Sequence, residues 1–333
     1  MRQDRFVDRH AGEWAAFERW LDAREASPRR ARATRRSWDG LADEDVPSRY
    51  RRLCQQLALA RRRGYSPQVT ERLQALMQRG HNLLYRPPPA PWRGALVFLL
   101  ADFPRLVRAQ RGCLWASLAL FALPMVLLFV LVQIRPELAY SVLSTAQLAE
   151  MEAMYDPARA GQAFARDGQT DVQMFGYYVW NNVSIGFRTF ASGLLAGVGT
   201  IFVLLFNGTF FGVIAGHLQA IGHGGPFWRF VVGHSAPELT AIVIAGAGGL
   251  RLGLALVAPG RLRRVDALVR AGRDGGRLCL GILVMLVFAA FVEAFWSSTG
   301  ALPDALRFGV GGALWLLVLL WLWRGGRGRV DAG

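Results

Sequence analysis

The run "LWASLALFALPMVLLFVLVQI", residues 114–134, decides the fold class of this chain. It holds 21 residues without a charge. A helix rising about 1.5 Å per residue needs about 20 such residues to cross a hydrocarbon core of roughly 30 Å. Because backbone groups in lipid must be hydrogen-bonded within the protein, only helices and closed barrels span membranes. We therefore predict an all-α fold, a polytopic membrane helical bundle in which residues 113–134 form the first transmembrane helix.

Further apolar runs after this helix predict a bundle over residues 183–323. Residues 183–222 are too long for one span, and Asn207–Gly208 is a dipeptide that favours turns. We therefore expect two spans joined at Asn207–Gly208, of which the second, residues 209–222, is short. The remaining spans are expected at residues 237–257, 278–297 and 305–323, which gives about six in total.

Residues 1–92 differ from the rest and read as a separate helical domain. "FVDRHAGEWAAFERWL" places Phe6, Trp14, Phe17 and Leu21 along one face of a helix. Residues 47–63 and 67–84 predict two more helices, each opened by a proline. Residues 93–112 combine an apolar start with arginines, which is typical of a helix lying in the membrane interface.

The charge distribution predicts which side of the membrane each segment occupies. Residues 1–113 hold 23 arginines against 12 acids, and residues 259–277 hold six against two. The tail, residues 324–333, holds three against one, whereas residues 135–182 hold three arginines against six acids. Basic segments stay in the cytoplasm, so we expect cytoplasmic termini, a cytoplasmic loop at 259–277 and an extracytoplasmic segment at 135–182. The net charge of +15 fits membrane lipids better than nucleic acid, for which no binding signature is present.

Glycines in the apolar half recur at intervals of four residues, which places them on one helix face. Such faces let helix backbones approach closely in lipid. Packing within one chain is the simpler interpretation, and a homo-oligomer seam is the alternative. The predicted packing positions are Gly193, Gly197, Gly208, Gly212, Gly216, Gly249 and Gly253.

Ionisable residues near the apolar runs are costly to bury and are candidates for function. Those that the topology places toward the outer half include His217, His234, Glu238 and Glu293, and Asn207 joins them as the helix break. Such a group could bind a metal, relay a proton or hold a lipid headgroup. A structural role is equally available for Glu238, because Ser235 three residues earlier predicts a capping box.

Signatures of enzymes and cofactors are missing from the sequence. The metalloprotease, serine-hydrolase and phosphate-loop motifs are absent, so we expect no catalytic residue, cofactor or committed metal site. The three cysteines are far apart and show no metal-binding spacing.

Several blocks in order give the chain a family resemblance. They include "MEAMYDP", "MFGYYVWNNV", "FASGLLAGVGTIFVLLFNGTFFGVIAGHL" and "ELTAIVIAGAGGLRLG", with "FVDRHAGEWAAFERWL" and "FPRLVR" before them. Together they resemble the stage II sporulation protein M family of bacterial integral membrane proteins. The resemblance implies a non-enzymatic protein of the bacterial cytoplasmic membrane that assembles with peptidoglycan-degrading partners, or, in non-sporulating bacteria, occurs beside a MoxR-type ATPase system.

From these observations we expect a multi-pass scaffold that assembles other membrane or cell-wall-associated proteins. The alternative is a transporter or a lipid- or precursor-handling protein with a His/Glu site near the outer face.

Overall fold

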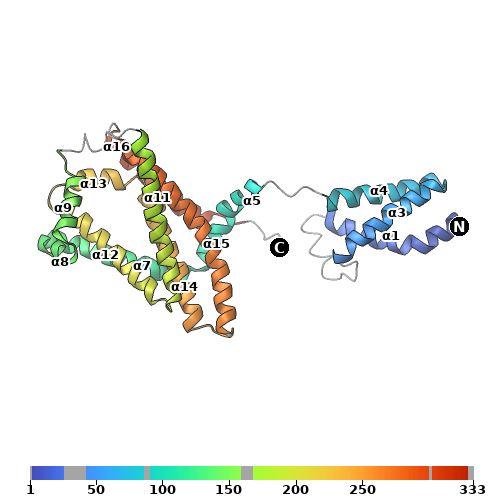
Figure 1. Cartoon of the computed structure of the whole chain (residues 1–333), viewed down its shortest axis with the longest axis horizontal. Coiled ribbons are helices and arrows are strands. Elements are labelled where there is room, and N and C mark those ends of the chain that lie inside the picture. Colours follow the sequence, from blue (N-terminus) through green and yellow to red (C-terminus); the bar gives the residue numbers. More distant parts are fainter. Residues whose placement is uncertain (1, 26–42, 86–90, 159–167, 300–301, 329–333) are drawn as a thin grey trace. The chain divides into compact units, whose positions relative to one another are not determined.

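The computed structural model describes residues 2–25, 43–85, 91–158, 168–299 and 302–328, and its regular elements there are all helical. The chain divides into two compact units, one ending at Arg93 and one beginning at Gly94. Figure 1 shows the helices of both units. The predicted all-α class is confirmed.

The first unit is a bundle of three helices: α1 (Gln3–Glu25), α3 (Val46–Arg62) and α4 (Pro67–Leu84), with a short 3-10 turn, η1 (Asp43–Asp45), before α3. The predicted face of α1 is buried in their common core together with Trp20. Trp14 donates from Nε1 to Gln56 Oε1 at 2.7 Å, which satisfies the one polar atom of the indole. Residues 26–42, between α1 and η1, lie outside the described residues.

Part of residues 93–112, predicted as an interfacial helix, packs against other helices of the second unit. They form α5 (Pro91–Val97), a π-helical turn η2 (Phe98–Asp102) and α6 (Phe103–Ala109). Phe103 is fully buried and stacks on Trp321 at a centroid distance of 5.4 Å. Its ring occupies the space where Gly281 lacks a side chain. The apolar face of α6 contacts protein, and its position in the membrane interface stays a prediction.

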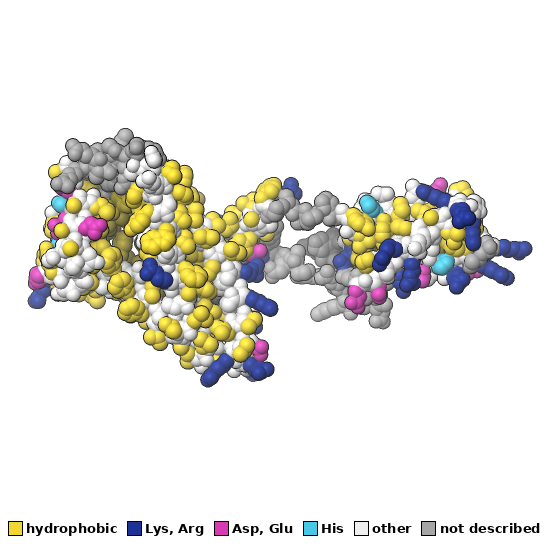
Figure 2. All heavy atoms as spheres, in the orientation of Figure 1, with side chains coloured by type: hydrophobic (Ala, Val, Ile, Leu, Met, Phe, Trp, Pro, Cys, Tyr) yellow, Lys and Arg dark blue, Asp and Glu magenta, His cyan; other side chains and the backbone are white. Residues whose placement is uncertain are grey.

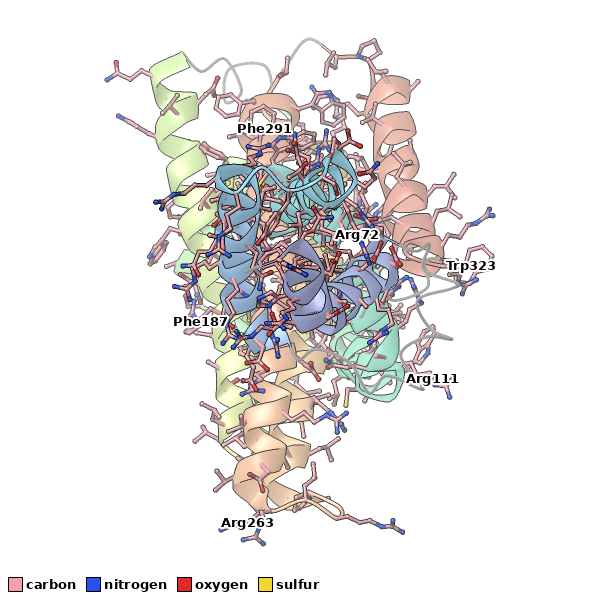
Figure 3. All side chains as sticks on the ribbon, turned by 90° about the vertical axis from the view of Figure 1, so that its right-hand side faces the viewer. Arg72, Arg111, Phe187, Arg263, Phe291 and Trp323 are labelled. Carbon is pink, nitrogen blue, oxygen red and sulfur yellow. The ribbon has the colours of Figure 1, made fainter. Side chains whose placement is uncertain are left out.

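Within the described parts of the chain, five helices are long and apolar enough to cross a membrane. They are α7 (Arg111–Ile134), α12 (Val198–Ala220), α14 (Ser235–Val257), α15 with its extension η5 (Arg264–Ser297) and α16 (Asp304–Arg324). Figure 2 shows hydrophobic side chains over the surface of this unit. Figure 3 labels Arg263 and Phe291 toward the two ends of α15. A multi-pass membrane protein is thus confirmed.

The predicted break at Asn207–Gly208 is wrong, because α12 runs through it as one helix. Asn207 donates from Nδ2 to the carbonyl of Val203 at 2.7 Å, inside the helix. The turn lies earlier, at η4 (Ser192–Leu194) and Gly197, which has a φ of +85°. Glycine adopts this left-handed conformation without the steric cost of a side chain.

The helix before that turn, α11 (Gly168–Ala191), has 24 residues and packs against α14 and α15. It exposes Trp180 and Phe187, but its polar residues keep it outside the five apolar spans. The predicted extramembrane segment at residues 135–182 includes the first part of α11. Its first part forms η3 (Pro136–Leu138), α8 (Ala139–Val142) and α9 (Thr145–Met154).

The predicted cytoplasmic loop at residues 259–277 is also shorter than expected. Helix α14 ends at Val257 and α15 already begins at Arg264, so the basic residues from 264 to 277 belong to a helix. At the opposite end of α14, a short helix α13 (Gly224–Val231) connects it to α12.

Glycines at the predicted packing positions lie against the backbones of neighbouring helices of the same chain. A Cβ on Gly208 would meet the Phe121 carbonyl oxygen at 2.2 Å, and one on Gly212 would meet that of Met125 at 2.3 Å. Gly216 repeats the contact one turn further along α7. On the other side, Gly193 and Gly249 lie together, as do Gly197 and Gly253. The seven glycines thus join α12 to α7 and the η4 turn to α14.

Candidate functional site

Three ionisable side chains converge where α14 begins and α15 ends. His234, Glu238 and Glu293 each offer a ligand atom, and these atoms all lie within 4.8 Å of one another. His234 Nε2 and Glu238 Oε2 are 3.7 Å apart. This distance exceeds a normal hydrogen bond, so the space between the atoms suits a small bound ion.

Local sequence explains how α14 contributes two members of this cluster. His234 directly precedes the helix and Glu238 lies one turn later, so the i and i+4 side chains share a face. Gly233 allows the close approach, because a Cβ there would lie 2.4 Å from the Trp296 ring and 3.0 Å from Ser297 Oγ. The Gly-His pair is therefore what brings this turn against η5.

The third member depends on a π-helical segment. Helix α15 continues from Phe291 into η5 (Val292–Ser297), which carries both Glu293 and Ser297. π-Helical segments are rare in proteins, and those that occur are often found at functional sites. The end of η5 is held by Arg307, whose guanidinium donates to the carbonyls of Ser297, Thr299 and Leu302.

Neighbouring polar groups orient the cluster. His234 Nδ1 lies 3.1 Å from Ser297 Oγ, and Asn182 of α11 donates from Nδ2 to Glu293 Oε2 at 3.4 Å. Asn182 Oδ1 in turn accepts from Asn181 Nδ2 at 3.1 Å. Sequence reasoning missed Asn182 and Ser297. The available signals were an Asn-Asn pair in an otherwise apolar stretch and a serine four residues after Glu293.

Burial sets the charge state of the cluster. His234 and Glu293 are both buried, at 4% and 9% exposure. Desolvation lowers the pKa of His234, which precedes the first residue of the α14 span, and thereby favours the neutral imidazole, in which one nitrogen can act as a ligand. A neutral imidazole beside two carboxylates can bind a divalent cation or share a proton.

The predicted capping box at Ser235 and Glu238 is wrong. The N-cap is His234 and its side chain makes no capping bond, while Ser235 is already inside α14. Ser235 Oγ instead donates to the Val232 carbonyl and accepts from Trp315 Nε1 at 3.1 Å. Glu238 is consequently free of a capping role and faces His234.

The other two candidates lie outside this cluster. His217 is buried on α12 and its Nε2 lies 2.6 Å from Glu152 Oε1 of α9. Asn207 hydrogen-bonds within its own helix. The structure therefore assembles three of the five predicted site residues.

Comparison with known protein families identifies the family to which this helical bundle belongs. The family model described as Stage II sporulation protein M matches residues 117–298, more than half of the chain. The chain belongs to the stage II sporulation protein M family. Searches of curated proteins and of solved structures gave no match.

The sporulation protein M match includes every residue of the His234 cluster but not α16 or the first unit. Residues 4–86 instead match a domain of unknown function, DUF8413. The early blocks of the resemblance therefore lie outside the family match, and the N-terminal helices are a second domain joined to a sporulation protein M bundle.

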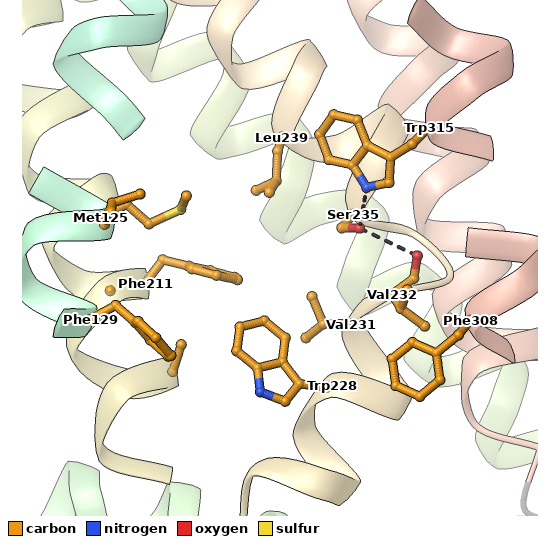
Figure 4. A pocket seen from close by; sticks show the side chains of 13 residues that line it. Met125, Phe129, Phe211, Trp228, Val231, Val232, Ser235, Leu239, Phe308 and Trp315 are labelled. Carbon is orange, nitrogen blue, oxygen red and sulfur yellow. Dashed lines mark hydrogen bonds between the residues drawn. The ribbon is translucent and has the colours of Figure 1, made fainter. Parts of the chain in front are cut away.

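An apolar groove lies between α7 and α16, with α14 as its floor. One part, drawn in Figure 4, has a volume of about 410 Å³ and is lined by aromatic side chains that include Phe129, Trp228 and Trp315. A second part of about 640 Å³ shares Met125, Leu239 and Trp315 with the first. It extends to Arg108 and Arg111. This sporulation protein M bundle thus carries a continuous apolar groove with arginines at one end.

Proposed function

We propose that this protein is a non-enzymatic membrane scaffold that holds partner proteins at the bacterial cytoplasmic membrane. The observation that carries the proposal is the division into two units, each with a core of its own. The first unit encloses Phe6, Trp14 and Leu73 in one cluster, whereas the membrane unit has separate clusters among its helices. A domain with its own core beside a membrane bundle is suited to recruiting a soluble partner.

The surface of the first unit is charged and suited to protein contacts. Several of its arginines pair with acids of α1, as Arg79 does with Asp22 and Glu25. Others, such as Arg51 and Arg62, are exposed. In this proposal the unit lies in the cytoplasm and receives partners such as a MoxR-type ATPase system, while α8 and α9 meet cell-wall-associated proteins on the other side.

Crosslinking co-purification from the native membrane tests this function. The full chain is compared with a chain in which residues 1–92 are replaced by an unrelated helical domain of similar size. We expect the replacement to stay in the membrane but to lose its cytoplasmic partners. Equal recovery of the same partners from both chains would contradict the scaffold function.

The groove favours a second candidate, a protein that handles lipids or lipid-linked precursors. Its apolar walls suit acyl chains, and Arg111 is exposed at its end beside Arg108, whose pKa is lowered by burial and by Arg327 and Arg105. We infer that the occupant is an anionic phospholipid whose phosphate lies at Arg111.

Native mass spectrometry tests this second candidate with phosphatidylglycerol and phosphatidylcholine added to the detergent-purified chain. One arginine near anionic headgroups contributes about 1 kcal/mol, which is about fivefold in affinity. Arg111→Gln should therefore weaken retention of phosphatidylglycerol about fivefold, while the exposed Arg261→Gln serves as the control. Equal retention of both lipids by the wild type would exclude the site.

A further inference from the structure

We propose that His234, Glu238 and Glu293 form a binding site for one divalent transition-metal ion of the zinc type. Their ligand atoms lie within 4.8 Å of one another, and they come from two elements that are far apart in the sequence. In a tetrahedral zinc site with bonds of about 2.0–2.2 Å, two ligand atoms are roughly 3.4 Å apart. The 3.7 Å between His234 Nε2 and Glu238 Oε2 is close to this value.

The position of Ser297 gives the imidazole the arrangement that metal-binding histidines use. A ligating histidine commonly donates its other ring N–H to a nearby oxygen, which fixes the tautomer. Here Ser297 Oγ lies 3.1 Å from Nδ1. When Nδ1–H donates to this hydroxyl, Nε2 presents its lone pair toward the two carboxylates. The Nε2 lone pair and the carboxylate oxygens repel one another. A cation placed between these atoms would be coordinated by all of them.

Asn182 orients the Glu293 carboxylate, as Ser297 orients the His234 imidazole. Its Nδ2 donates to Glu293 Oε2 at 3.4 Å, and Asn182 itself is buried. Because ligating carboxylates are themselves held by hydrogen bonds, this contact orients the Glu293 carboxylate within the cluster.

The energetics of burial also favour a bound cation. Carboxylates cost several kcal/mol each to bury as ions unless they are compensated. Arg229, nine residues before Glu238, pairs with Asp304, and Arg307, fourteen residues after Glu293, donates to three backbone carbonyls. A divalent ion would neutralise Glu238 and Glu293 together.

The donor set selects the kind of metal. One imidazole nitrogen with two carboxylates suits zinc, manganese or ferrous iron, whereas calcium and magnesium prefer shells made of oxygen alone. Three protein ligands leave a fourth position for water or for a group of a partner molecule. The site does not depend on the scaffold function, because the cluster lies wholly within the membrane unit.

The chain offers a matched control for this site. His217 and Glu152 are likewise a histidine and a carboxylate in contact, at 2.6 Å. They are not part of the three-member cluster. His217→Ala therefore removes a buried histidine of the same unit without removing a proposed ligand.

The test uses the full chain, purified in detergent, stripped with a chelator and titrated with zinc. Inductively coupled plasma mass spectrometry should find one zinc per chain for the wild type and for His217→Ala. Glu293→Gln, an isosteric change, and His234→Ala should each bind zinc at least tenfold more weakly than the wild type. Ser297→Ala, which keeps all three ligands, should weaken binding about tenfold or more. X-ray absorption should show a first shell of nitrogen and oxygen.

Two results would overturn the site: a wild-type chain that takes up no stoichiometric zinc, or Glu293→Gln that folds and binds as tightly as the wild type. The second result would leave a shared proton between His234 and the carboxylates as the role of the cluster. If Glu293→Gln fails to fold, zinc uptake by the wild type and the loss caused by Ser297→Ala decide between these outcomes.

Discussion

Gly193 and Gly249 meet backbone to backbone, since a Cβ added to Gly193 would lie 2.1 Å from the Gly249 carbonyl oxygen. This contact holds the turn between α11 and α12 against the middle of α14. Seven residues after Gly193, Thr200 of α12 donates from Oγ1 to the Thr189 carbonyl of α11 at 2.8 Å. Together these contacts fix three helices of the bundle to one another.

Gly193→Ala should therefore destabilise the bundle. Overpacking against backbone atoms, which cannot rotate away, typically costs about 1–3 kcal/mol. We expect a lower thermal midpoint for the purified protein in detergent. Gly276→Ala is the control, because nothing lies within 4 Å of a Cβ there. An unchanged midpoint for Gly193→Ala would show that the close contact is not required.

The position of the turn predicts a topology that differs from a break at Asn207. In a chain without its three native cysteines, Leu195→Cys should react with the same membrane-impermeant reagent as Arg263→Cys. Asn207→Cys, in the interior of α12, should remain unlabelled. Gln169→Cys, at the other end of α11, should react only from the opposite side if α11 crosses the membrane. Labelling of Gln169→Cys and Leu195→Cys from one side would contradict that crossing.

The sequence predicted helices well where local signals decide their ends. Helix α4 begins at Pro67 and ends at Leu84, as expected, and α3 differs from its expected bounds by one residue at each end. Prolines in the first turn carry this information locally. The first membrane span was equally predictable, because its length and apolarity need no tertiary partner.

The sequence misled where tertiary packing overrides a local preference. Asn207–Gly208 favours a turn in water, but Gly208 lies against the Phe121 carbonyl and Asn207 bonds within its helix. The part of α11 up to residue 182 was predicted to lie outside the bundle, because polar residues such as Asn182 lower its hydropathy. The polar side chain of Asn182 is hydrogen-bonded to Glu293. The two residues are 111 positions apart, so no local sequence pattern reveals this contact.

The first unit should lose stability at high pH. Burial, with a lesser contribution from Cys54, raises the pKa of Tyr50 to about 12, from an unfolded value near 10. The folded state then keeps its proton where the unfolded state has lost it, so stability is fully present below pH 10 and falls as pH rises toward 12. The limiting slope is about 1.4 kcal/mol per pH unit.

Denaturant unfolding of a fragment covering residues 1–92, at pH 9 and pH 11, measures this effect. Tyr50→Phe removes the titrating group and should reduce the difference between the free energies of unfolding at pH 9 and pH 11. A difference equal to that of the wild type would assign the pH dependence to other groups. Failure of the fragment to fold would also show that the unit needs the rest of the chain.

The contact between His217 and Glu152 should anchor α9 to α12. His217 Nε2 lies 2.6 Å from Glu152 Oε1, and the ring of Tyr140 packs edge-on against the imidazole. A double-mutant cycle with His217→Ala and Glu152→Ala should give a coupling energy of about 0.5–3 kcal/mol, the range for residues in contact. Limited proteolysis within residues 139–154 should become faster in either single variant, because α9 loses this contact. Additive effects of the two substitutions, with unchanged proteolysis, would mean that the hydrophobic contacts of Leu148 and Tyr155 hold this segment without the pair.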